Sequence, residues 1–119
     1  MTNHEDAAET PQAACYAVIF TSLRSRKYEE QDNGYEETAR RMLALASRQP
    51  GFLSVESARD KDGFGITVSY WRDLDAIKAW RKNIEHREAQ RLGRAQWYEF
   101  YNVRICKVEK EYGFSADKL

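Results

Sequence analysis

The pattern of apolar and polar residues along the chain predicts a small mixed α and β domain. Short runs rich in β-branched and aromatic residues predict strands, and two longer segments carry apolar residues at helical spacing. The turn sequence R-D-K-D-G lies between two of the strands and predicts a hairpin. We expect strands at residues 16–23, 52–58, 63–71 and 98–109, with helices after the first and third strands.

Helix start and stop signals bound the helical segments. Asn33 and Glu36 have the spacing of a capping box, and Pro50 followed by glycine ends the first helix. Asp73 is a good N-cap for the second helix, which we expect to break or bend near residues 83–85. The predicted apolar stripes are Tyr35, Ala39, Met42, Leu43 and Ala46 in the first helix and Leu74, Ile77, Trp80 and Ile84 in the second.

The element order βαββαβ predicts an α+β ferredoxin-like sandwich, with a four-stranded antiparallel sheet and both helices on one face. The first strand is apolar on both alternating sets of positions, so its second face also needs a cover. A second copy of the chain, packed sheet to sheet, is the simplest cover. The pattern therefore predicts a homodimer.

The segment from Trp71 to Trp97 is the most informative for function. It carries all three tryptophans and the histidine, His86, that lies outside the N-terminal residues. On a helix, His86, Ala89, Gln90, Gly93 and Trp97 share one face. An imidazole, an amide, a glycine gap and an indole on one face indicate more than packing, although a close approach by a neighbouring strand is the simplest reason for Gly93.

Length and charge restrict the domain count and the partners. The 119 residues make one domain, expected over residues 15–112, with a flexible N-terminal tail at 1–14 and a C-terminal tail at 113–119. The 19 basic and 19 acidic residues balance, so we expect neither a nucleic acid nor a membrane as partner. No apolar run resembles a signal peptide or a membrane span, so a cytoplasmic protein is the default expectation. Cys15 and Cys106 fit no metal-ligand spacing and are expected to be small apolar fillers.

Three motifs together resemble one known family. The P-G-F-L-S-V-E-S junction, the S-Y-W at the end of the third strand with the following D-A-I-K-A-W helix, and E-H-R-E-A-Q-R-L-G-R-A-Q-W-Y are similar to the antibiotic biosynthesis monooxygenase (ABM) domain family. The resemblance covers residues 16–112. It implies a dimeric α/β barrel with a pocket between each sheet and its helices.

The resemblance also implies two kinds of chemistry. Some members oxygenate aromatic polyketides with no metal or flavin, and others bind and cleave haem with a histidine ligand. His86 matches the histidine of the family's second-helix region, and Trp71 matches a tryptophan that lines the pocket. Ser22 stands nearest to the strand-one asparagine that is usual in the haem-degrading branch, and this departure weakens the resemblance to that branch.

A cofactor-free oxygenase needs a base of near-neutral pKa, a dry pocket and hydrogen-bond donors. His86 is the candidate catalytic base, and Trp71 and Trp97 are the expected walls around an aromatic ligand. Gln90, Tyr98 and Asn102 could orient the oxygens of that ligand, whereas Trp80, at the spacing of Ile77, is expected to be core. In the last strand, Tyr98, Phe100, Asn102, Arg104 and Cys106 are expected to share one face, with Arg104 paired to an acid such as Glu56.

Two further classes of function stay open on the sequence alone. The βαββαβ order is shared with RNA-recognition domains, but the strand-three octamer departs from theirs at Asp62, Ile66 and Ser69, and the net charge is zero. A non-catalytic dimeric binder of small molecules fits as well, because no nucleophile-base triad or metal cluster is evident. The function predicted here is that of a cofactor-free monooxygenase, with a haem-binding or haem-degrading enzyme as the alternative.

Overall fold

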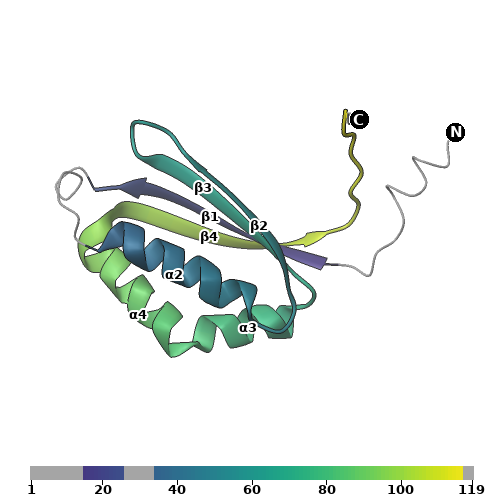
Figure 1. Cartoon of the computed structure of the whole chain (residues 1–119), viewed down its shortest axis with the longest axis horizontal. Helices are drawn as coiled ribbons and strands as arrows, with labels where there is room; N and C mark the ends of the chain where they lie inside the picture. The colour runs from purple at the N-terminus through teal and green to yellow at the C-terminus, as the bar shows by residue number, and fades with distance from the viewer. Residues whose placement is uncertain (1–14, 26–33, 117–119) are drawn as a thin grey trace, which may run out of the picture.

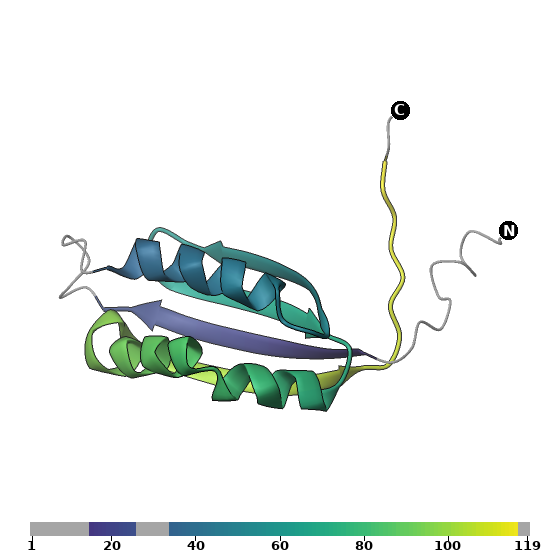
Figure 2. The ribbon, with the colours of Figure 1, turned by 60° about the horizontal axis from the view of Figure 1, so that its bottom comes forward.

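The computed structural model describes residues 15–25 and 34–116 and shows the predicted α+β architecture. The strands form one antiparallel sheet in the order β2-β3-β1-β4, and the helices form a single layer on one face of it (Figures 1 and 2). The predicted tails at 1–14 and 117–119 and the capping residue Asn33 lie outside the described residues. The elements are β1 (Cys15–Arg24), α2 (Tyr35–Ser47), β2 (Phe52–Arg59), β3 (Phe64–Trp71), α3 (Leu74–Lys82), α4 (Ile84–Leu92), a π-helical turn η2 (Gly93–Trp97) and β4 (Tyr98–Val108).

Strand register decides which side chains lie under the helices. Val18 on β1 pairs with Ser69 on β3 and with Ile105 on β4, and Val18 packs against the buried core on the helix side. Because paired residues in an antiparallel sheet point to the same face, every second residue from Val18 belongs to the helix face. The helix face thus includes Phe20, Ser22, Thr67, Gly65, Val103 and Tyr101.

A cluster of buried residues lies at one end of the helix face. Trp71, with 0% of its surface exposed, packs with Ala46 of α2 and Ile77 of α3. Phe52 meets the Trp71 ring edge-on at 5.4 Å between centroids. This cluster joins the sheet to α2 and α3 at the end where β3 finishes.

The first helix differs from its prediction at the start and in its rotation. Gly34, with φ of 90°, precedes α2, and no side chain caps it. Ala39 and Leu43 of the predicted stripe are exposed, whereas Thr38 and Leu45 turn inward. The stripe prediction was therefore wrong at Ala39 and Leu43, because the helix lies with a neighbouring face toward the sheet.

The second helical segment breaks as predicted. Asp73 caps α3 by accepting a hydrogen bond from the backbone nitrogen of Ala76. Asn83 stands between α3 and α4 and caps the latter. Ile77 is buried and Trp80 half-buried, but Leu74 is 51% exposed, and the side chain of Ile84 lies outside the description. The π-helical turn that ends α4 had no signal in the sequence.

A bulge in β4 changes the predicted face of Tyr98. Leu23 pairs with Phe100, but the next β1 residue, Arg24, pairs with Tyr98, so the register shifts by one residue. Tyr98 therefore lies on the helix face with Phe20, to which its ring stands edge-on at 5.6 Å. The prediction that Tyr98 shares a face with Asn102 was wrong for this reason.

The opposite, uncovered face of the sheet carries large apolar side chains. Phe64, Ile66 and Phe100 are 42%, 42% and 46% exposed. Arg104 and Glu56 lie in one row across this face but belong to the two edge strands, with β3 and β1 between them. The predicted pair between them is not formed, and Glu56 instead accepts a hydrogen bond from Tyr70. Cys106 is exposed and Cys15 half-buried, both as free thiols, so Cys106 is not the predicted filler.

Among the described residues, no helix is long and apolar enough to cross a membrane.

Candidate functional site

Two clusters lie at opposite ends of the helix face. The first, called here the imidazole end, consists of Trp71, Trp80 and His86 as a ladder of rings. Trp80 stacks on Trp71 at 6.2 Å between centroids, and His86 stacks on Trp80 at 4.3 Å with the planes only 14° apart. The ladder runs from the fully buried core at Trp71 out to the half-buried imidazole.

Hydrogen bonding fixes the tautomer of His86. Its Nδ1 lies 3.1 Å from the backbone carbonyl oxygen of Trp80. A carbonyl can only accept, so Nδ1 carries the proton and Nε2 keeps its lone pair. Burial lowers the pKa of His86 below its ordinary value, the bond to Trp80 opposes this, and Arg81 lowers it further. The ring is therefore neutral at pH 7 and presents a basic nitrogen that has no hydrogen-bond partner among the described residues.

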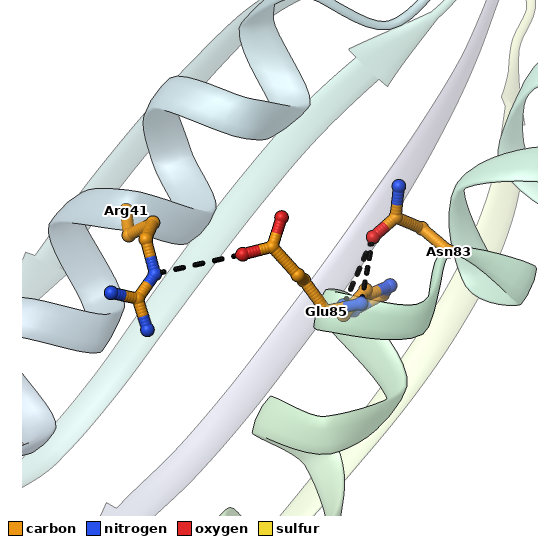
Figure 3. A network of polar contacts seen from close by, with 4 residues as sticks. Arg41, Asn83 and Glu85 are labelled. Atoms are coloured by element: carbon orange, nitrogen blue, oxygen red, sulfur yellow. Dashed lines mark hydrogen bonds and ion pairs between the residues drawn. The ribbon is translucent and has the colours of Figure 1, made fainter.

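Local contacts hold α4, and with it His86, beside α2. The Asn83 side chain accepts hydrogen bonds from the backbone nitrogens of Glu85 and His86 at 2.9 and 3.3 Å. The Glu85 carboxylate reaches across to Arg41 of α2 at 3.8 Å (Figure 3). Both partners of this ion pair are more than half exposed, so it adds little stability. Its contribution is to the spacing of the two helices above β1.

The second cluster, called here the arginine–tyrosine end, consists of Ser22, Arg24, Tyr35, Arg59 and Tyr98. The Tyr98 hydroxyl donates to the Tyr35 hydroxyl at 3.3 Å, and Nη2 of Arg59 donates to the same oxygen at 3.2 Å. The Arg24 guanidinium lies over the Tyr35 ring at 3.6 Å. Burial, and then the neighbouring Tyr35, raise the pKa of Tyr98 far above its ordinary value, so Tyr98 stays protonated.

Gly65 makes room for the Arg59 side chain. A Cβ atom at Gly65 would lie 2.6 Å from the guanidinium carbon of Arg59. The missing side chain lets Arg59 lie across β3 from the edge strand β2 and donate to Ser22 on β1 at 2.8 Å. The same guanidinium donates to the Gly63 carbonyl. Arg59 is therefore held in place by groups from β1, the hairpin turn and α2.

Between the two ends, the helix layer leaves part of the sheet uncovered. Val103 and Ile105 belong to the helix face, yet they are 40% and 41% exposed. Half-buried Phe20 lies beside Val103 on β1. The backbone of α4 approaches α2, α3 and η2 more closely than it approaches β4. These three residues form an apolar floor between the imidazole end and the arginine–tyrosine end.

The predicted face of α4 is confirmed by burial. His86, Ala89 and Gln90 are half-buried and Gly93 is buried, whereas Arg87 and Glu88 are exposed. A Cβ at Gly93 would lie 3.0 Å from the Tyr98 ring, so the glycine admits a strand residue, as expected. Gln90 also borders an open hollow of about 400 Å³ whose other lining residues are Arg87, Glu88, Arg91 and Arg94.

The structure separates the remaining predicted site residues. Trp71 is fully buried and donates its Nε1 to Ser69 at 2.9 Å, so it is core and presents no surface to a ligand in this conformation. Trp97 is 4% exposed and stands edge-on to Tyr35 at the arginine–tyrosine end. Asn102 is exposed on the uncovered face, opposite the helices, which corrects its placement beside the ligand. His86 and Tyr98 are on the same face but at different ends of it.

Three residues of these clusters had no functional prediction: Tyr35, Arg24 and Arg59. Trp80 was expected to be core, and it is the ring on which His86 stacks. For Arg59 the available signal was Gly65, because a glycine within a strand often marks a close approach. Among the described residues no group of three or more histidine, cysteine or acidic side chains could hold a metal ion.

Comparison with known proteins gives one family. The family model described as antibiotic biosynthesis monooxygenase matches residues 20–92, more than half of the chain. A protein of Bacillus subtilis (strain 168), the uncharacterized YqjZ, is 54% identical over 110 residues, which are 92% of this chain and 93% of that protein. A jasmonate monooxygenase of Pyricularia oryzae is 30% identical over 78% of this chain, which spans only 43% of the length of that protein.

Solved structures agree with the fold. A mutant form of SnoaB from Streptomyces nogalater, a cofactor-independent oxygenase, superposes with a TM-score of 0.63. The sequences are 19% identical, and the match covers 82% of this chain and 95% of that one. PA3566 from Pseudomonas aeruginosa has a TM-score of 0.63 at 18% identity, over 86% of this chain and 96% of its own. At such identities the likeness establishes the fold alone.

Proposed function

This chain belongs to the antibiotic biosynthesis monooxygenase family, and on that premise we propose that it oxygenates an aromatic, polyketide-like molecule with O₂ and no cofactor. The observation that carries the proposal is the neutral His86, whose partnerless Nε2 belongs to the face that holds the exposed apolar floor. The relatives described as a jasmonate monooxygenase and as a cofactor-independent oxygenase support the reaction class.

The chemistry follows from a base next to an apolar surface. His86 Nε2 takes the proton of a phenol, and the phenolate gives one electron to O₂. The phenoxyl radical and superoxide join at a ring carbon, and the imidazolium protonates the new peroxide. His86 then takes the hydrogen of that carbon as a proton while the O–O bond breaks. The sum is phenol plus O₂ to quinone plus water, so the four electrons lost by the ring are those that O₂ gains.

The residues of the chain supply orientation and a dry surface for these steps. The bond from His86 Nδ1 to Trp80 keeps Nε2 as the reacting nitrogen in every cycle. Phe20, Val103 and Ile105 offer the apolar floor on which a flat ring can lie. Tyr98, kept protonated by its raised pKa, donates its hydrogen to the Tyr35 hydroxyl, so the hydrogen of Tyr35 can bond to an oxygen at the far end.

The test is oxygen consumption by chelator-treated, flavin-free protein with 1-naphthol. We expect one O₂ consumed per quinone formed and no O₂ returned by catalase, because the second oxygen leaves as water. His86→Gln should lower the rate by about 10²–10⁴-fold, the usual contribution of a general base. The matched control is Arg87→Gln, the exposed neighbour on α4, which should keep the rate.

Three results would overturn the cofactor-free proposal. An unchanged rate in His86→Gln would remove the base, and no oxygen consumption with any phenol would favour the non-catalytic binder. A Soret band that shifts when haem is added, and that His86→Gln abolishes, would favour the haem enzyme. The partnerless Nε2 is the feature that supports haem ligation, since an axial ligand needs a free nitrogen lone pair.

We also propose that the chain works as a homodimer through the uncovered face of the sheet. Phe64, Ile66 and Phe100 expose more than two-fifths of their surfaces there, and a second copy would bury them. Ile66→Glu should convert a dimer to a monomer in sedimentation velocity. Leu43→Glu, on the equally exposed apolar Leu43 of α2, should leave the dimer intact. A monomeric wild type would contradict the proposal.

A further inference from the structure

Hydrogen-bond donors outnumber acceptors at the arginine–tyrosine end. Arg59 donates from Nη1 to the Gly63 carbonyl and from Nη2 to Ser22 and Tyr35. These bonds use the two Nη2 hydrogens and one on Nη1. The Nε hydrogen and the second Nη1 hydrogen have no acceptor in the described part of the chain. A guanidinium held this firmly, with donors left over, is organised to receive an acceptor.

Arg24 adds a second cation to the same cluster. Its Nε donates to the Trp97 carbonyl at 3.2 Å, and its guanidinium carbon lies over the Tyr35 ring. Neither Nη1 nor Nη2 makes a hydrogen bond within residues 15–25 and 34–116. The stacking fixes the plane of the guanidinium, and no described residue occupies its terminal nitrogens.

Hydroxyl groups of the cluster also have hydrogens that no described residue accepts. The Tyr35 oxygen receives hydrogen bonds from both Tyr98 and Arg59, so its own hydrogen points to neither of them. Ser22, which has 0% of its surface exposed, receives a hydrogen bond from Arg59, and its own hydrogen has no acceptor among the described residues. A buried hydroxyl hydrogen normally has an acceptor, so the described part of this cluster lacks one at Ser22.

No carboxylate of the described residues balances these charges. The ion pairs there are Arg40 with Glu37, Arg41 with Glu85 and Arg91 with Glu88, and none of them includes Arg24 or Arg59. Without an anion among the described residues, two guanidinium groups beside the same tyrosines repel each other, and the half-buried Arg24 is costly to desolvate. An anionic ligand would offset both costs.

The geometry of the helix face shows what kind of anion fits. The cluster lies at one end of the apolar floor, and His86 lies toward the other. From His86 to Trp97 the helical rise spans about 15 Å, the length of a molecule of two or three rings with its polar ends. Arg59 is exposed, so a ligand can reach it from solvent. A planar carboxylate matches the fork of a guanidinium better than a point-like anion does.

We propose that Arg24, Arg59 and Tyr35 bind a carboxylate at the end of the aromatic substrate remote from the group that reacts at His86. That the carboxylate belongs to a substrate rests on the proposed function. The anion site itself rests on the cluster alone. The enzyme would then select phenols that carry a carboxylate two rings away. Ser22 and Tyr98 hold Arg59 and Tyr35 in position and are positioning residues.

The experiment measures the binding of one rigid two-ring probe, 4′-hydroxybiphenyl-4-carboxylate, and of its methyl ester by calorimetry. We expect the acid to bind at least tenfold more tightly than the ester at low salt. Arg24→Gln and Arg59→Gln should each abolish that preference. Tyr35→Phe should reduce it severalfold, because it removes one donor and keeps the ring under Arg24. The control is Arg40→Gln, the same substitution at an exposed arginine of α2, which should keep the preference for the acid.

The outcomes separate this site from the reaction. His86→Gln should keep the preference for the acid even though turnover is lost, so a failure of the oxygenase proposal leaves the binding result intact. Equal affinities for acid and ester in the wild type, or a preference that survives Arg24→Gln and Arg59→Gln, would overturn the site. If Arg59→Gln fails to fold, Arg24→Gln and Tyr35→Phe still decide. The variant E29Q/E30Q/D32N should bind the acid as the wild type does; tighter binding would show that the chain's own acids already neutralise the arginines.

Discussion

The two ends of the helix face hold their polar groups in opposite ways. At the imidazole end, one titratable ring is stacked on apolar rings and kept neutral by burial. At the arginine–tyrosine end, two permanent charges are held by hydroxyls, carbonyls and an aromatic ring. The first arrangement provides a base whose protonation state can change near neutral pH. The second provides fixed donors that cannot lose their charge.

The two ends should also differ in their contributions to stability and to ligand recognition. The imidazole end is continuous with the buried core through Trp71, whereas Arg59 at the other end is exposed and bound to a strand edge. Changes in the first should therefore alter the free energy of unfolding more than changes in the second. Changes in the second should alter ligand preference with a modest loss of stability.

The largest expected effect is from Trp71→Ala. Removing a fully buried indole from the core should lower the free energy of unfolding by about 3–5 kcal/mol, the usual cost of such a truncation. Urea unfolding at fixed protein concentration measures it, since a dimer makes apparent stability depend on concentration. Phe114→Ala, at 87% exposure, should change stability by less than about 0.5 kcal/mol. A loss below about 1 kcal/mol for Trp71→Ala would show that this ring is a pocket wall after all.

An intermediate effect is expected from Gly65→Ala. The new methyl group would occupy the space of the Arg59 guanidinium and break its bonds to Ser22 and Gly63. Hydrogen bonds of a charged group contribute about 1.5–3 kcal/mol each, so we expect a loss of about 1–3 kcal/mol after rearrangement. In an Arg59→Ala background the same substitution should cost much less, because the clash is gone.

Chemical denaturation of the four proteins of this cycle gives the coupling directly. Gly113→Ala, where an added Cβ meets nothing within 4 Å, is the matched glycine control. An equal cost of Gly65→Ala with and without Arg59 would mean that strand geometry, not the arginine, requires the glycine.

The sequence predicted the fold because each element carries its own local signal. The runs of β-branched and aromatic residues, the hairpin turn and the Asp73 cap are properties of neighbouring residues, and the strands, hairpin and cap that they predict are confirmed. The site was predicted only in part because it depends on contacts between distant residues. The bulge that turns Tyr98 toward the helices is a property of strand pairing, and so is the position of Arg59 over Gly65. Asn102 was grouped with Tyr98 because a strand without a bulge would place both on one face.

Whether His86 is buried could not be predicted from the sequence pattern. A histidine between Glu85 and Arg87 on a helix is compatible with a solvated surface ring. Only the rotation of α4, set by the Asn83 cap and the helix layer, brings the ring onto Trp80.

The smallest expected effect is the pH dependence that His86 gives to folding. Its pKa is lowered in the folded chain, so the unfolded state binds the proton more tightly. Stability from this group is therefore fully present above the unfolded pKa of about 6.5 and is lost as the pH falls through 6.5 toward the folded pKa. His86→Gln should remove this part of the slope between neutral and mildly acidic pH.

His4→Gln provides the matched control, because the chain has two histidines and this variant keeps only the one on α4. Its single imidazole signal in proton NMR should titrate with a midpoint below about 6.5, and its unfolding should retain the wild-type slope. Trp80→Leu should move that midpoint back toward the ordinary value, since the ring that shields one face of the imidazole is gone. A midpoint at or above about 6.5 in the His4→Gln protein would mean that the imidazole is hydrated or paired with an acid. His86 would then not be a neutral base, and the contrast with the fixed charges at the arginine–tyrosine end would not hold.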